Sequence, residues 1–245
     1  MRELILFGLG AALLAGCGNG GKPIRMITEA AFPPCEFLRG ECEIVGVDVE
    51  IGRAVAKRLG REFEVDSNDF DSVLPAVMNG SADLAVAGIT VTEARKRLVD
   101  FSIPYMSAGI VVIYRKSNPF KDVAQLKGRR ISVQAGTTSE DYVRSELKQE
   151  ATGFGTAAEA VIGLKEGIFD FVIADIGVAK HCAKGDPDLA VSGFLTSEDY
   201  AVAVAKGRPE LLKAVNETIA ALKADGTIAR WLESYTVEAD SQKEN

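Results

Sequence analysis

The chain has 245 residues, 47% of them apolar, and its 28 Lys and Arg against 35 Asp and Glu give a formal charge of −7. This composition excludes an intrinsically disordered chain, and an acidic balance without a basic run argues against nucleic acid as a partner. The one histidine, His181, argues against a zinc centre and against catalysis by an imidazole pair. The length fits one large α/β domain or two lobes of roughly 100 residues each.

The N-terminus carries an export signal. Arg2 precedes the apolar run 4–14, which at about eleven residues is shorter than the roughly 20 that a membrane-spanning helix needs. The run ends in Leu-Ala-Gly-Cys, which resembles the lipobox of bacterial lipoproteins. We therefore expect a signal peptide at 1–16, lipidation of Cys17, a tether at 17–22, and a protein anchored in the periplasm or on the outer face of the cell membrane. The alternative is a plain secretory signal with a chance cysteine.

From residue 23 onward, short apolar runs alternate with helical patterns, which indicates α/β architecture. The first half predicts a strand at 24–28, a helix at 49–59 that stops at Gly60, a strand at 63–65, a helix that opens at 71–75 with Pro75 in its first turn, and a strand at 82–87.

The alternation then begins again, which indicates a second α/β unit inserted into the first. It predicts strands at 110–114, 131–134 and 169–174, a helix-like turn at 123–126, and helices at 139–149, at 157–165 and from 176. Helices at 209–224 and 227–235 close the fold, and the polar stretch 237–245 lacks periodicity and is expected to be disordered.

Two strand-to-helix junctions suit an anionic ligand. In the first, Thr90 and Glu93 have capping-box spacing, and Arg95 follows within about one turn. In the second, Thr137 and Glu140 repeat that spacing. A guanidinium and free N–H groups at a helix start both bind a carboxylate. A phosphate is the alternative guest, although neither loop has the spacing of a nucleotide-binding loop.

Asp175 and three cysteines complete the candidates. Asp175 ends a predicted strand, where ligands collect in open α/β sheets, and it could bind an ammonium group or only cap the next helix. Cys35 and Cys42 flank a predicted hairpin turn in an exported chain, so a local disulfide is expected rather than two free thiols. Cys182 is expected to be a partly buried helix residue, because one His and one Cys are too few to ligate a metal.

Six motifs stand in the order typical of one family. They are Thr28–Pro34 (TEAAFPP), Gly46–Ile51 (GVDVEI), Asp69–Asp71 (DFD), Gly88–Arg95 (GITVTEAR), Val133–Thr138 (VQAGTT) and Ala174–Asp175. The chain resembles, from about Ile24 to Tyr235, the polar amino acid-binding proteins of ABC importers, the solute-binding family 3. The resemblance implies the two-lobed, type 2 periplasmic-binding-protein fold with two crossover hinge strands. Lobe 1 would comprise 23–107 and 202–236, and lobe 2 would comprise 108–201.

The resemblance also implies roles for single residues. Arg95 would bind the ligand α-carboxylate with help from Thr90 and from backbone groups at Gly88 and Thr138, and Asp175 would bind the α-ammonium. Phe32 and Phe70 would sandwich the ligand side chain, with Glu29 and Gln134 near its far end, and Asp48 would be structural. The expected ligand-binding residues are Glu29, Phe32, Phe70, Ala87, Gly88, Thr90, Arg95, Gln134, Thr137, Thr138 and Asp175. Cys35 and Val47 depart from the family pattern, which puts the packing of the hairpin in question.

We therefore expect a monomeric binding protein, without cofactor or metal, that delivers a polar L-amino acid to an ABC permease. Glu29 favours arginine or lysine, with glutamine or histidine as the alternative; if Glu29 faced solvent, the pocket would accept many polar amino acids. Two rival functions stay open. One is an enzyme like the cyclohexadienyl dehydratases of the same fold, and the other is a sensor subunit, which would need a separate signalling partner because no apolar stretch after Tyr235 could span a bilayer.

Overall fold

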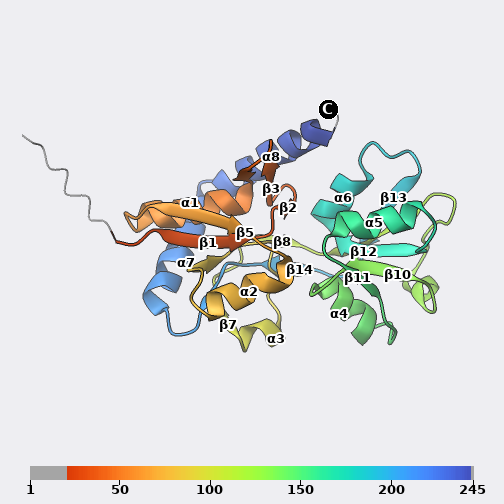
Figure 1. Cartoon of the computed structure of the whole chain (residues 1–245), viewed down its shortest axis with the longest axis horizontal. Coiled ribbons are helices and arrows are strands. Elements are labelled where there is room, and N and C mark those ends of the chain that lie inside the picture. The colour runs from red at the N-terminus through yellow and green to blue at the C-terminus, as the bar shows by residue number, and fades with distance from the viewer. Residues whose placement is uncertain (1–20, 244–245) are drawn as a thin grey trace, which may run out of the picture.

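The computed structural model describes residues 21–243, and Figure 1 shows two lobes side by side. The predicted signal peptide, most of the tether and Cys17 lie outside these residues. The first sheet has the strand order β5-β1-β6-β15-β7, formed by β1 (Ile24–Thr28), β5 (Phe63–Ser67), β6 (Leu84–Ala85), β7 (Val99–Phe101) and β15 (Ala203–Ala205). Its helices are α1 (Val47–Arg58), α2 (Phe70–Met78), α3 (Glu93–Lys96), α7 (Pro209–Ala224) and α8 (Thr227–Lys243).

The second sheet has the order β11-β10-β12-β9-β13, formed by β9 (Ile110–Arg115), β10 (Ile131–Gln134), β11 (Thr152–Phe154), β12 (Phe171–Asp175) and β13 (Leu189–Phe194). The 3₁₀ turn η1 (Val123–Leu126) and the helices α4 (Thr138–Ser145), α5 (Ala157–Lys165) and α6 (Ile176–Ala183) belong to this lobe. In both sheets the strands that precede the candidate site are parallel to a neighbour, so their carboxyl ends meet at one edge.

Two antiparallel strands join the lobes. They are β8 (Met106–Ala108) and β14 (Glu198–Tyr200), which pair as a separate two-stranded ribbon. This ribbon confirms the two predicted crossovers, and it leaves the facing edges of the two sheets on either side of it. Among residues 21–243, no helix combines the length and apolar character that a membrane span requires.

Several element predictions were confirmed, and the reasons are local. The strand 131–134 and the helices 157–165 and 209–224 have the predicted bounds. The α5 helix begins with a capping box between Thr156 and Glu159, and Pro209 occupies the first turn of α7. The prediction for α2 was wrong at its start, because the helix begins at Phe70 and Pro75 therefore lies inside it rather than in its first turn.

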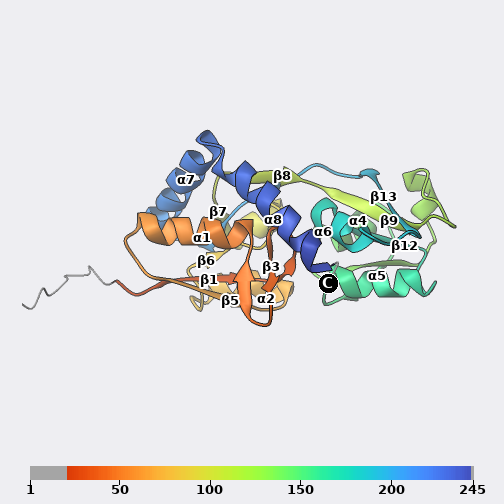
Figure 2. The ribbon, with the colours of Figure 1, turned by 90° about the horizontal axis from the view of Figure 1, so that it is seen from above.

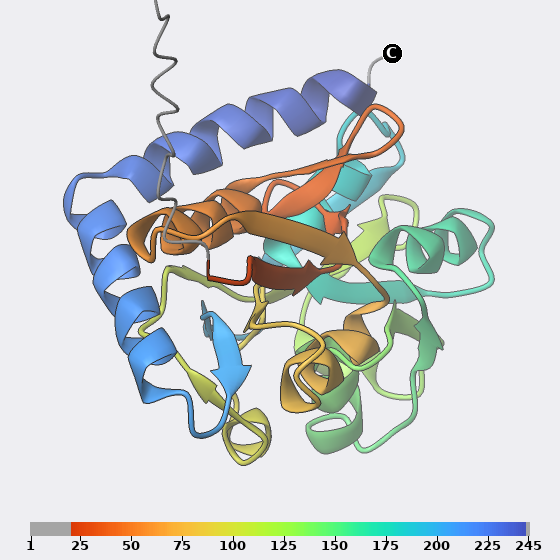
Figure 3. The same ribbon diagram turned by 60° about the vertical axis from the view of Figure 1, so that its left-hand side comes forward.

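The predicted disordered tail was also wrong, because α8 continues to Lys243. Figures 2 and 3 show this helix running across the molecule from α7 toward α6. Ala239 is 4% exposed and packs with Phe37 and Val45 of the N-terminal hairpin. Asp240 forms an ion pair at 2.6 Å with Lys184, the residue that follows α6. These partners lie far away in the sequence, so the local pattern of the tail did not reveal them.

The hairpin at the N-terminus consists of β2 (Ala31–Phe32), β3 (Glu36–Arg39) and β4 (Glu43–Val45). The two residues that depart from the family pattern, Cys35 and Val47, are 2% and 0% exposed and belong to one hydrophobic core. Gly46, at φ 133°, has no room for a side chain, because a Cβ there would lie 2.1 Å from the Cys35 carbonyl oxygen. The two departures are therefore accommodated as buried packing.

The predicted disulfide between Cys35 and Cys42 was wrong, because neither thiol is bonded to the other. The hairpin register explains this result. Arg39 pairs with Glu43, which places Cys42 in the turn, whereas Cys35 precedes β3 at the opposite end. The five residues from Cys35 to the turn correspond to about 16 Å of strand, which exceeds the Cα separation that a disulfide can bridge. Cys35 is buried and Cys42 is exposed.

Candidate functional site

All eleven predicted ligand-binding residues line one pocket between the lobes. Glu29, Phe32, Phe70, Ala87, Gly88, Thr90 and Arg95 come from the first lobe, and Gln134, Thr137, Thr138 and Asp175 come from the second. The pocket is narrow because side chains from the two lobes already bond to each other across it.

Arg95 is held over the pocket from α3. Its Nη1 donates to the Thr90 carbonyl oxygen at 2.9 Å and its Nη2 donates to the Gly136 carbonyl oxygen of the other lobe at 3.1 Å. The guanidinium lies over the Phe70 ring, 5.3 Å from its centroid. The predicted capping box was wrong, because Thr92, not Thr90, caps α3 and accepts the Arg95 N–H.

The second junction leaves the start of α4 open to a ligand. Thr137 is the N-cap residue, but its hydroxyl donates to the Gln134 carbonyl oxygen at 2.8 Å and makes no cap bond. Glu140 accepts the Gly136 N–H at 2.8 Å and not the Thr137 N–H, so the capping box predicted for Thr137 and Glu140 was wrong. The first N–H groups of α4 therefore lack a side-chain acceptor at the edge of the pocket.

Asp175, at the end of β12, is 9% exposed and accepts a hydrogen bond from the Tyr200 hydroxyl. Burial, followed by the charge of Glu198, raises its pKa to about 7, although the bond from Tyr200 and the charge of Arg95 oppose this rise. Asp175 is also the N-cap residue of α6, but its side chain makes no cap bond. Its carboxyl group is thus directed to Tyr200 and the pocket.

Glu29 lines the pocket and does not face solvent, since it is 6% exposed. Gln134 Nε2 donates to both of its carboxylate oxygens, at 2.7 and 2.8 Å, and links the lobes. Burial raises the pKa of Glu29 to about 7, against the lowering effect of the Gln134 bond. The nearby carboxylates Asp69 and Asp71 add to the rise.

Phe32 packs against the loop that carries Gly88. Its ring meets Tyr200 edge to face, with 6.2 Å between the centroids. Gly88 has φ 52°, and a Cβ at that position would lie 2.6 Å from Phe32 Cε1. A glycine is therefore required at this wall of the pocket.

Two residues of the site were missed at the sequence level, Tyr200 and Glu198, both on the hinge strand β14. Glu198 Oε2 accepts hydrogen bonds from the Thr90 hydroxyl at 2.7 Å and from the Thr138 hydroxyl at 2.8 Å. One carboxylate thus binds a threonine from each lobe. No local pattern marks Glu198, because its partners come from distant segments.

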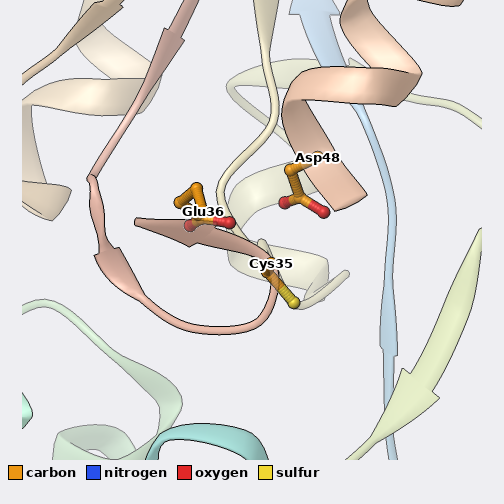
Figure 4. A group of neighbouring side chains, drawn as sticks. All are labelled: Cys35, Glu36 and Asp48. Carbon is orange, nitrogen blue, oxygen red and sulfur yellow. The ribbon is translucent and has the colours of Figure 1, made fainter. Parts of the chain in front are cut away.

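Asp48 does not line the pocket and supports it from behind, in keeping with a structural role. Its Oδ2 accepts the Gly88 N–H at 2.8 Å and the Tyr105 hydroxyl at 2.7 Å. Asp48, Cys35 and Glu36 form the one group of three potential metal ligands found within residues 21–243, with ligand atoms within 4.8 Å of one another. Figure 4 shows this cluster, which is separate from the pocket. Cys182 is half-buried on α6, as predicted.

A pocket between two hinged α/β lobes, with an arginine and a carboxylate on facing walls, defines the class of two-lobed binding proteins. Residues 24–238 match the family of bacterial extracellular solute-binding proteins, family 3, and the chain belongs to this family.

Curated relatives extend over nearly the whole chain. The ABC transporter arginine-binding protein 1 of Escherichia coli K12 is 32% identical over 234 residues, which cover 93% of this chain and 96% of the relative. The L-cystine-binding protein TcyJ of the same organism is 30% identical over 212 residues, covering 84% and 80%. The crystal structure of the substrate-binding protein AbpA of Streptococcus pneumoniae bound to L-arginine has a TM-score of 0.82 at 32% identity, covering 89% of this chain and 95% of that one. This chain is therefore an amino acid-binding component of an ABC transport system.

Proposed function

We propose that the protein captures a cationic L-amino acid, arginine before lysine, and delivers it to an ABC permease. The observation that carries this proposal is the buried Glu29 carboxyl group in a pocket that Arg95 and Asp175 also line. In this proposal Glu29 lies at the end of the pocket away from the α-groups of the ligand. Arg95 and the open N–H groups of α4 suit the α-carboxylate, and Asp175 suits the α-ammonium. Glu29 is then left for the charge of the side chain.

Charge balance supports a cationic ligand over an anionic one. Among the residues that line the pocket, Glu29 and Asp175 are acidic and Arg95 is basic, and Glu198, bonded to Thr90 and Thr138, adds another acidic group beside them. The fully ionised site is therefore negatively charged. An amino acid with a cationic side chain offsets this charge, whereas glutamate would bring a further carboxylate beside Glu29. The arginine-bound relatives agree with this choice, and the cystine-binding relative shows that family membership alone does not fix the ligand.

The pocket residues bond across the lobes, which favours a mechanism in which ligand binding stabilises closure about β8 and β14. In this proposal 23–107 and 202–236 move as one lobe and 108–201 as the other. The mature protein acts as a monomer that Cys17 anchors to the membrane through a lipid.

The test is a thermal-shift screen of the protein amino acids, followed by calorimetry, on protein freed of bound ligand by unfolding and refolding. Arginine and lysine should raise the melting temperature most, and Glu29→Gln should weaken both selectively. Glu64→Gln, an exposed glutamate of the same lobe, is the matched control. Tight binding of glutamate, or no response to any amino acid, would contradict the proposal.

One observation favours a second function. The buried carboxyl group of Glu29 has a pKa of about 7, which suits a proton donor at neutral pH. An enzyme of this fold that acts on prephenate or arogenate would need such a proton donor. Incubation with either compound, followed by product analysis, separates the two functions. Turnover that Glu29→Gln abolishes would establish the enzyme.

A further inference from the structure

The most unusual group outside the pocket is a pair of buried carboxyl groups behind it. Glu36 and Asp48 are both 0% exposed, and the Cys35 thiol beside them is 2% exposed. Within residues 21–243, no donor group reaches either oxygen of Glu36 or the Oδ1 of Asp48, whereas the two carboxyl groups lie close enough to share a hydrogen bond once one of them is protonated. Figure 4 shows the two carboxyl groups side by side, and the Cys35 sulfur lies within 4.8 Å of an oxygen of each. A proton or a cation between these acceptor atoms would remove the cost of leaving them buried without donors.

The surroundings oppose a second negative charge. No Lys or Arg of residues 21–243 forms an ion pair with either carboxyl group. The carboxyl groups that act on Glu36 are those of Asp48 on α1, Glu29 after β1 and Asp175 on β12. The Cys35 thiol and the Tyr105 hydroxyl also interact with it, and no base is among these groups. Burial together with the charge of Asp48 raises the pKa of Glu36 well above its usual range.

The hydrogen bonds indicate which of the two carboxyl groups, Glu36 or Asp48, is ionised. Asp48 Oδ2 already accepts the Gly88 N–H and the Tyr105 hydroxyl, both of which stabilise a carboxylate. Glu36 has no such donor. One proton on Glu36, directed to the free Oδ1 of Asp48, supplies the missing donor.

We propose that Glu36 is a protonated positioning residue, which donates its O–H to Oδ1 of Asp48 and so fixes the carboxylate that holds the Gly88 loop. Asp48 bonds to Gly88, and Gly88 forms the wall of the pocket against Phe32. The proton on Glu36 therefore contributes to the shape of the pocket without touching a ligand. Only this last link rests on the proposed function.

A divalent metal is the other way to occupy the cluster. Cys35, Glu36 and Asp48 could supply one ligand atom each. A metal would require the Cys35 thiol, which is 2% exposed beside two carboxyl groups, to lose its proton, although burial raises the pKa of this thiol well above its usual range. Sharing one proton between the carboxyl groups needs no such loss. The burial of the thiol beside these groups therefore favours the proton.

The first test is the pH dependence of stability, which needs no ligand. Glutamate in an unfolded chain has a pKa of about 4.3. A carboxyl group with a raised pKa in the folded state stabilises the fold less and less as pH rises above that value. Relative to Glu36→Gln, the unfolding equilibrium constant of the unmodified protein should rise about tenfold per pH unit between about pH 5 and pH 8. Glu41→Gln, an exposed glutamate of the same hairpin, should leave the pH profile unchanged.

The second test compares the arginine affinity of two substitutions at Glu36, one that keeps a hydrogen-bond donor and one that removes it. Gln at position 36 can donate an N–H to Asp48, so Glu36→Gln should keep the affinity for arginine. Glu36→Leu, which has no donor, should lose about tenfold in affinity. The infrared carbonyl band of a protonated carboxyl group should be present in the unmodified protein and reduced in Glu36→Gln.

Two results would overturn the assignment. One is a pH profile of Glu36→Gln that matches the unmodified protein, because Glu36 would then be ionised. The other is stoichiometric zinc in the purified protein that Cys35→Ser removes. If no amino acid bound at all, the proposed function would fail while the stability and infrared tests still reported on Glu36.

Discussion

Acidification should weaken arginine binding more than binding of citrulline, its uncharged ureido analogue. Burial raises the pKa of Glu29 to about 7. A cationic side chain requires the ionised carboxylate, so binding below this pH must first remove a proton. Because the pKa of Glu29 is raised, the affinity for the cationic ligand reaches its full value above about pH 8 and decreases as the pH falls through 7.

The magnitude follows from the ionised fraction of Glu29. With a pKa of about 7, about half of the protein is ionised at pH 7 and about one part in 100 at pH 5. The ratio of arginine affinity to citrulline affinity should therefore fall about 50-fold over this interval, or about 2.3 kcal/mol. Citrulline is the necessary comparison, because the pKa of Asp175 is also about 7 and the proposed contact of Asp175 with the α-ammonium would be the same for both ligands.

Calorimetry at about pH 8, 7 and 5 with both ligands gives this ratio directly. In Glu29→Gln the ratio should not depend on pH, whereas Glu64→Gln should behave like the unmodified protein. A ratio that stays constant in the unmodified protein would refute the assignment of Glu29 to the cationic group. The same would follow if Glu29→Gln kept the pH dependence.

Three further outcomes are expected. In calorimetry, Arg95→Ala should reduce the binding free energy of every amino acid ligand by about 2–5 kcal/mol, because it leaves the α-carboxylate of the ligand buried and unpaired. A loss of affinity confined to arginine would contradict this role of Arg95. Glu198→Ala should weaken the binding of all ligands by about 1–3 kcal/mol, because two threonine hydroxyls from opposite lobes lose their shared acceptor. Small-angle scattering at saturating arginine should then show less compaction. Unchanged affinity and compaction would exclude this residue from closure. When the native protein is alkylated and its peptides are analysed by mass spectrometry, the exposed Cys42 should react, whereas the buried Cys35 should react only after unfolding. A peptide in which Cys35 and Cys42 form a disulfide would show that the hairpin register is wrong.

The sequence by itself determined the fold class and most of the pocket. Buried strands followed by glycine-containing turns and capping residues are local patterns, and they placed Arg95, Thr138 and Asp175 near the carboxyl ends of strands. Such ends meet at one edge of a parallel sheet, so residues far apart in the chain could be assigned to one site. The motif order added the expectation of two lobes, and the family match agrees with it.

Only the tertiary structure decided the contacts between distant segments. Glu198 belongs to the site because Thr90 and Thr138, from different lobes, both donate to its carboxylate. The hairpin register separated Cys35 from Cys42, and burial of Ala239 against residues about two hundred positions earlier extended the last helix. These outcomes depend on register and on long-range packing. Neither is encoded in the spacing of neighbouring residues, because each depends on which surfaces the rest of the chain presents.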